Sequence, residues 1–66
     1  MDDVRSAPPM TRARAIVKSV VREADQPLSA AEIRQRALER DPHLAPLTVA
    51  IATADLRLAG KIEVRR

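Results

Sequence analysis

Apolar residues recur every three or four positions from residue 13 to residue 24, which predicts an amphipathic helix. The stripe consists of Ala13, Ile16, Val17, Val20, Val21 and Ala24. Thr11 is a suitable N-cap for this helix, and Pro27 ends it because proline disfavours helical geometry at the preceding residue. Residues 1–10 show no periodicity and contain Pro8-Pro9, so we expect a flexible arm there.

A second helix is predicted to begin directly after Ser29. Ser29 and Glu32 have the spacing of a capping box, in which each side chain accepts a hydrogen bond from the other residue's backbone N–H. Leu28 and Ile33 occupy the two positions of a hydrophobic staple. Asp41-Pro42 ends this helix.

A third helix is predicted from Pro46 to about Ala59, with Gly60 as its left-handed stop. One apolar stripe should pack on the other helices and consists of Val49, Ala52, Leu56 and Ala59. A second stripe, roughly opposite, consists of Leu47, Ile51, Ala54 and Leu58. A helix that is apolar on two sides is usually buried on both. The second stripe should therefore be covered in part by the segment that follows the helix, or by a partner protein.

The segment after Gly60 alternates between polar and apolar residues from Lys61 to Arg65. This alternation predicts a half-buried strand with Ile62 and Val64 facing inwards. The residues around Leu28 offer it a short pairing partner.

Two stretches of the chain carry a resemblance to the winged helix-turn-helix domains of bacterial regulators, such as the DNA-binding half of ferric uptake regulators. They are Pro27-Leu28-Ser29-Ala30-Ala31-Glu32-Ile33, and Thr48-Val49 followed by Leu56 and Gly60-Lys61-Ile62. The resemblance covers residues 11–66 and implies one domain, mostly α with a small β component. Arg65-Arg66 falls where a wing hairpin would turn, so we expect a truncated wing.

Composition narrows the classes of function. With 66 residues there is room for one domain, and without Phe, Tyr or Trp its core must be aliphatic. The same absence argues against binding single-stranded nucleic acid by base stacking. No apolar run is long enough for a membrane span, and no cysteine is present, so we expect a cytoplasmic protein that does not bind membranes.

The first functional hypothesis is binding of double-stranded DNA by a regulatory or accessory protein. The net charge of +3 favours an anionic partner. The resemblance implies that the third helix lies in the major groove while the wing contacts the backbone. The expected contacts, mostly to phosphates, are Arg14, Lys18, Arg22, Thr48, Ala50, Thr53, Arg57, Lys61, Arg65 and Arg66.

The alternative hypothesis is a protein-docking domain, either a homodimer or a subunit of a larger complex. The first turns of the third helix contain no Arg, Lys, Asn or Gln, the side chains that make most bidentate base contacts. The expected protein interface is the second apolar stripe, Leu47, Ile51, Ala54 and Leu58.

Catalysis has no support in the sequence. His43 is the only histidine and lies in a link, and a single His without Cys does not build the usual zinc site. The single glycine excludes a glycine-rich phosphate loop. We therefore expect no enzyme, no metal, no cofactor and no small-molecule substrate.

Overall fold

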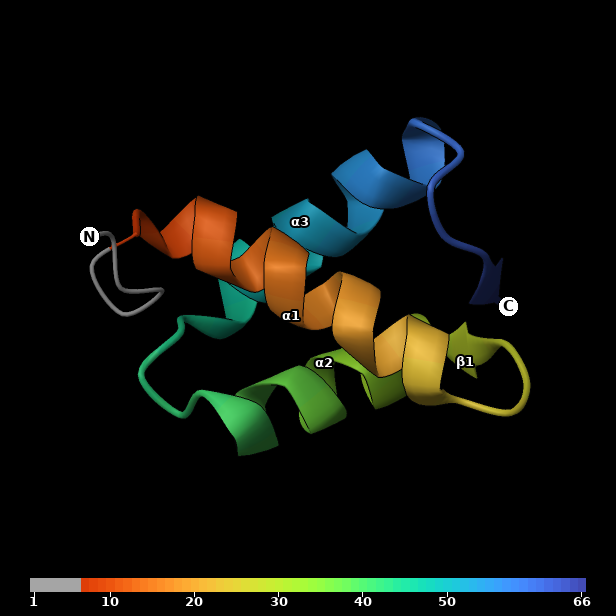
Figure 1. Ribbon diagram of the computed structural model, residues 1–66, viewed down its shortest axis with the longest axis horizontal. Coiled ribbons are helices and arrows are strands. Elements are labelled where there is room, and N and C mark those ends of the chain that lie inside the picture. Colours follow the sequence, from red (N-terminus) through yellow and green to blue (C-terminus); the bar gives the residue numbers. More distant parts are fainter. Residues whose placement is uncertain (1–6) are drawn as a thin grey trace.

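The computed structural model describes residues 7–66, which form three helices and two short strands. In chain order these are α1 (Pro9–Glu23), β1 (Leu28–Ser29), α2 (Ala30–Arg40), α3 (Pro46–Leu58) and β2 (Val64–Arg65). Helix α1 crosses in front of both other helices in the view of Figure 1, and it packs against each of them. The predicted class, mostly α with a small β component, is confirmed.

Helix α1 begins at Pro9, two residues before the predicted cap. Pro8 is the N-cap residue, and its carbonyl oxygen accepts a hydrogen bond from the backbone N–H of Arg12 at 3.1 Å. Proline suits the first helical position because its missing N–H has no partner there in any case. Thr11 is therefore inside the first turn, and the prediction that it caps the helix is wrong. Residues 1–6 of the predicted arm lie outside the described residues.

Helix α2 begins as the sequence predicts. The hydroxyl oxygen of Ser29 accepts from the backbone N–H of Glu32 at 3.2 Å, and Glu32 Oε1 accepts from the backbone N–H of Ser29 at 3.0 Å. Leu28 and Ile33, on either side of this cap, are both buried. The capping box thus satisfies two backbone donors while the staple residues anchor the helix start in the core.

Helix α3 has the two ends that its sequence predicts. Pro46 occupies the first turn, and Gly60 adopts a left-handed φ of 73° beyond the last turn. The backbone N–H of Lys61 donates to the carbonyl of Leu56 at 2.9 Å, and that of Gly60 donates to Arg57 at 3.0 Å. These two bonds form a Schellman motif, which redirects the chain towards β2.

The sheet joins the two strands in parallel, with Leu28 opposite Val64 and Ser29 opposite Arg65. Its second strand covers only Val64–Arg65 of the predicted range 61–65, and Lys61 takes part in the Schellman motif instead. Ile62 and Val64 are half-buried and pack against the core, as expected.

The core lies between the three helices and is aliphatic. It consists of Ala13, Val17, Val20, Leu28, Ile33, Ala37, Leu44, Val49, Ala52 and Leu56. Leu44 belongs to the link between α2 and α3, so this link is anchored in the core as well. No helix within residues 7–66 has the length and apolar character needed to cross a membrane.

Candidate functional site

Helix α3 is the element that carries the candidate site, and its inner side fixes which residues face outwards. Val49, Ala52 and Leu56 are buried against the other helices. With about 100° between successive helical residues, the positions on the opposite side point away from these helices. The inner stripe predicted from the sequence is thus the packed face of α3, except that Ala59 at its end is exposed.

The four residues predicted as a protein interface form one exposed row on α3, which we call the outer stripe: Leu47, Ile51, Ala54 and Leu58. Leu47 is 70% exposed, Ile51 43% and Leu58 79%, and they are the exposed large hydrophobic residues among the described part of the chain. Val64 of β2 lines the same groove as Ala54, but the large side chains of Leu47, Ile51 and Leu58 stay exposed to solvent.

The residues of α3 predicted to contact DNA do not share one surface. Ala50 is exposed and Thr48 is half-buried. Thr53 is only 5% exposed, and its hydroxyl donates to the carbonyl oxygen of Val49 at 2.8 Å. The exposed position that its expected DNA contact requires is therefore wrong, because a hydrogen bond to its own helix allows this hydroxyl to lie in the core.

The three residues of α1 that were expected to contact DNA, Arg14, Lys18 and Arg22, are spaced four residues apart and form a basic ridge along one side of that helix. Arg14 is exposed, and its guanidinium donates to Asp55 Oδ2 of α3 at 3.1 Å. Lys18 is half-buried and Arg22 is exposed. Asp55 therefore offsets the charge of Arg14, leaving Lys18 and Arg22 as the cations of this ridge without an ion-pair partner in residues 7–66.

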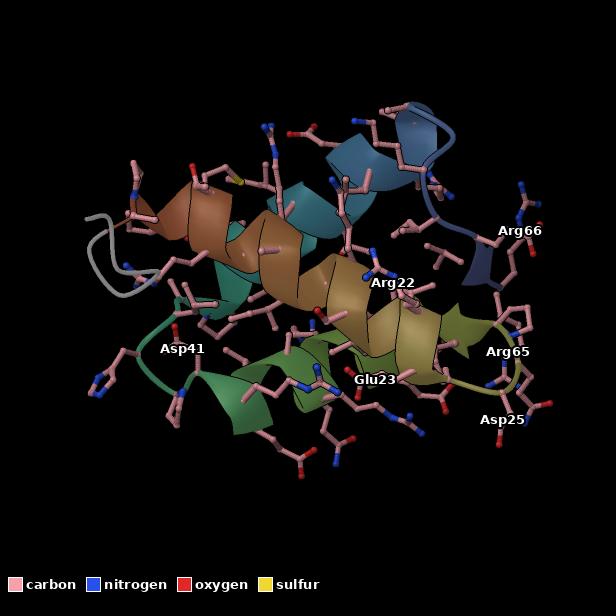
Figure 2. All side chains as sticks on the ribbon, in the orientation of Figure 1. Arg22, Glu23, Asp25, Asp41, Arg65 and Arg66 are labelled. Atoms are coloured by element: carbon pink, nitrogen blue, oxygen red, sulfur yellow. The ribbon has the colours of Figure 1, made fainter. Side chains whose placement is uncertain are left out.

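The basic residues near the C-terminal end of the described chain are spread over two places. Arg65 and Arg66 lie at the end of the molecule that also carries Asp25, opposite the end with Asp41 (Figure 2). Arg65 donates to Glu32 Oε1 at 2.6 Å, which ties β2 to the start of α2. Lys61 and Arg57 are exposed.

A groove of about 230 Å³ separates α3 from the start of α2 and from β2. It is lined by Ala30, Arg34, Ala50, Thr53, Ala54, Arg57 and Val64. Arg34 and Arg57 are both exposed and have no ion-pair partner among residues 7–66. The sequence pattern does not single out Arg34, although its position one helical turn after Ala30 places both on one side of α2.

Two other ion pairs that sequence reasoning missed hold the helices together. Arg12 Nε donates to Asp41 Oδ2 at 3.3 Å, joining α1 to the end of α2. Arg40 donates to both carboxylate oxygens of Glu23, at 2.6 and 3.1 Å, and joins the same two helices elsewhere. Long side chains on separate helices carry no local sequence signal for such pairing.

The pKa shifts follow these structural contacts. The pKa of Glu32 is lowered, mainly by the backbone N–H and the hydroxyl of Ser29 and to a smaller extent by Arg65. The hydrogen bond from Arg40 and its charge lower the pKa of Glu23, and that hydrogen bond raises the pKa of Arg40. All three shifts favour the charged forms that cap α2 or join helices, so they have structural causes.

Metal-ligating side chains do not gather in the part of the chain that the structure describes: no three of its His, Asp or Glu residues are grouped for an ion. His43 is exposed in the link between α2 and α3, where its backbone N–H donates to Asp41 Oδ1 at 3.1 Å.

The feature that remains without a structural explanation is the outer stripe of α3. In comparisons with known proteins, the chain matches no family model, no curated protein and no solved structure.

Proposed function

We propose that this chain is a non-catalytic protein-docking domain that binds its partner through the outer stripe of α3. The observation that carries the proposal is the exposure of Leu47, Ile51 and Leu58 in one row on one helix. Single exposed hydrophobic residues are normal, but a contiguous apolar row is typical of a protein interaction site.

The energetics favour a covered stripe. Burying an exposed leucine or isoleucine side chain yields roughly 1.5–3 kcal/mol. The outer stripe offers three such side chains, and Ala54 between them leaves room for a close approach. A partner that covers this row gains their transfer free energy without any rearrangement of the core.

The winged helix-turn-helix resemblance and the cytoplasmic location belong to this proposal. The order of helix, strand, two helices and strand supports the resemblance, as does the pairing of β2 with the segment before α2. Winged-helix domains differ in what they bind, so the function has to be argued from the surface of α3.

The proposal can be tested by photo-crosslinking in living cells of the native host. A photoreactive amino acid is placed at Leu58, and the control places it at Gln35, which is exposed on α2. We expect a defined protein adduct from position 58 and none from position 35. The absence of an adduct at position 58, with the variant expressed and folded, would contradict the proposal.

DNA binding is the second candidate function, and one observation favours it. Lys18, Arg22, Arg57, Lys61 and Arg66 have no ion-pair partner among residues 7–66 and are available to phosphates. The surface that would enter the major groove is less favourable. It presents leucine, isoleucine and alanine side chains, with the carboxylate of Asp55 beside them.

A titration of labelled random duplex with the protein, followed by fluorescence anisotropy, tests this second candidate. Phosphate binding through about four contacts predicts a log–log slope near −3.6 between about 50 and about 200 mM salt. Under the docking proposal, we expect weak binding that substitution of Leu58 does not alter. Tight, salt-sensitive binding that Leu58→Ala weakens would assign the outer stripe to DNA instead.

A further inference from the structure

The spacing of the residues in the outer stripe indicates which kind of partner fits it, which their exposure alone does not. Leu47, Ile51, Ala54 and Leu58 are separated by four, three and four residues. This is the spacing of a row that packs along a second helix at a shallow crossing angle. The order of these intervals is also the same in both directions along the chain. The identity of the partner rests on the proposed docking function.

We propose that the partner is a second copy of this chain, bound through antiparallel packing of its α3 on this one. A two-fold interface uses the same patch on both subunits, so the patch must be complementary to itself when turned around. A row with spacing four, three, four meets this condition. Leu47 of one copy then packs on Leu58 of the other, and Ile51 packs on Ala54.

The sizes of the side chains select the antiparallel arrangement. A parallel pair would place Ala54 on Ala54. Because the layers on either side would pair Ile51 with Ile51 and Leu58 with Leu58, a gap would remain between the two alanines. An antiparallel pair places the large Ile51 on the small Ala54 twice, so both layers are filled. Unfilled space between packed helices costs free energy in proportion to its volume.

The flanks of the outer stripe are compatible with the same arrangement. Thr48 and Asp55 lie along one flank, where Asp55 pairs with Arg14 of α1. Ala50 and Arg57 lie along the other flank, beside the groove. In the antiparallel pair, Thr48 comes beside Asp55 of the second copy and Ala50 beside Arg57. A hydroxyl then faces a carboxylate on this flank.

The interface is small, which sets the expected strength of binding. One helix face per copy lies below the size of standard stable interfaces, and such contacts are weak. We therefore expect a dissociation constant on the order of 100 µM, so the dimer is only partly populated in cells, where a covalent cross-link from position 58 traps it.

Sedimentation equilibrium of the purified chain from about 20 µM to about 1 mM tests the proposal. We expect a reversible monomer–dimer equilibrium that Ile51→Asp weakens at least tenfold. Ala31→Asp introduces the same charge at an exposed site in the first turn of α2 and should leave the dissociation constant unchanged. Leu58→Glu serves as a second variant at a more exposed site, and circular dichroism verifies that each variant folds.

Cysteine cross-linking tests the antiparallel orientation, since the chain has no cysteine of its own. In the antiparallel pair, the two copies of Leu58 are about 16 Å apart along the helix axis, because a helix rises about 1.5 Å per residue. A disulfide needs Cα atoms less than about 7 Å apart. An equal mixture of Leu47→Cys and ¹⁵N-labelled Leu58→Cys should therefore form mainly the mixed disulfide, which mass spectrometry resolves.

Three outcomes would overturn the proposal: a monomer throughout the concentration range, a dimer that Ile51→Asp does not weaken, or a Leu58→Cys disulfide that forms faster with itself than with Leu47→Cys. A monomer whose position 58 cross-links to a different protein in cells would refute the second copy and still support docking. A monomer without any adduct in cells would refute both.

Discussion

The inner and outer faces of α3 consist of the same kinds of side chain but lie in opposite surroundings. Val49, Ala52 and Leu56 are buried in the core, whereas Leu47 and Leu58 are among the most exposed aliphatic residues of the described chain. The inner face therefore contributes to the stability of the fold. The outer face contributes little to folding of the isolated chain, so its apolar character points to a function outside the chain.

The largest expected effect is a difference in stability between alanine variants of two leucines, one on each face of α3. Leu56→Ala should lower the free energy of unfolding by about 2–5 kcal/mol, because it leaves a cavity in the core. Leu58→Ala should change it by less than about 0.5 kcal/mol in dilute solution, because the side chain is exposed. Urea unfolding followed by circular dichroism measures both. An equal loss of unfolding free energy in both variants would mean that the outer face stabilises the fold as much as the inner face does, which would contradict its assignment to docking alone.

A second prediction separates stability from docking through the cap of α2. Ser29→Ala removes the hydroxyl that accepts from Glu32 and should cost about 1 kcal/mol of stability. Ser29 does not belong to the outer stripe, so cross-linking at position 58 should stay unchanged wherever the variant is folded. A loss of cross-linking in the fully folded variant would show that the docking surface depends on more than α3.

The third prediction concerns Thr53, which belongs to the inner face although its side chain is polar. Thr53→Val removes only a hydrogen bond within α3, so stability should change by less than about 1 kcal/mol. Affinity for duplex DNA, measured by anisotropy, should be unchanged in the same variant. A marked loss of DNA affinity would place this hydroxyl at a phosphate and contradict its buried position.

The smallest expected effect is a pH dependence of the stability that the cap of α2 contributes. The folded chain lowers the pKa of Glu32 below its ordinary value of 4.5. Its charge therefore stabilises the fold fully above that value, and the contribution disappears as the pH falls through the lowered pKa. The higher melting temperature of the wild type relative to Glu32→Gln should shrink over that range. A constant difference down to low pH would mean that the charge adds nothing to the cap.

Local features of the chain could be predicted from the sequence because they depend on neighbouring residues. The capping box at Ser29, the Schellman stop at Gly60 and both apolar stripes of α3 are set within one or two helical turns. The start of α1 was misplaced for a local reason as well. Pro9 itself occupies the first turn, a role for which proline is well suited.

Features that depend on the whole fold could not be predicted in the same way. Thr53 was expected to contact DNA, but a bond to the carbonyl of Val49 satisfies its hydroxyl in the core. The pairing of Arg14 with Asp55 joins residues from α1 and α3, which only the packing brings together. Likewise, the sequence shows that the outer stripe is apolar, but the exposure of its large side chains follows from the fold.

The most direct test of the outer stripe is a methyl NMR concentration series on the wild-type chain, from about 20 µM to about 1 mM. We predict that the methyl signals of Leu47, Ile51 and Leu58 shift together as the concentration rises. Those of Val49 and Leu56 on the inner face should stay in place. Shifts confined to other surfaces, or none on any face, would contradict docking of a second copy on α3.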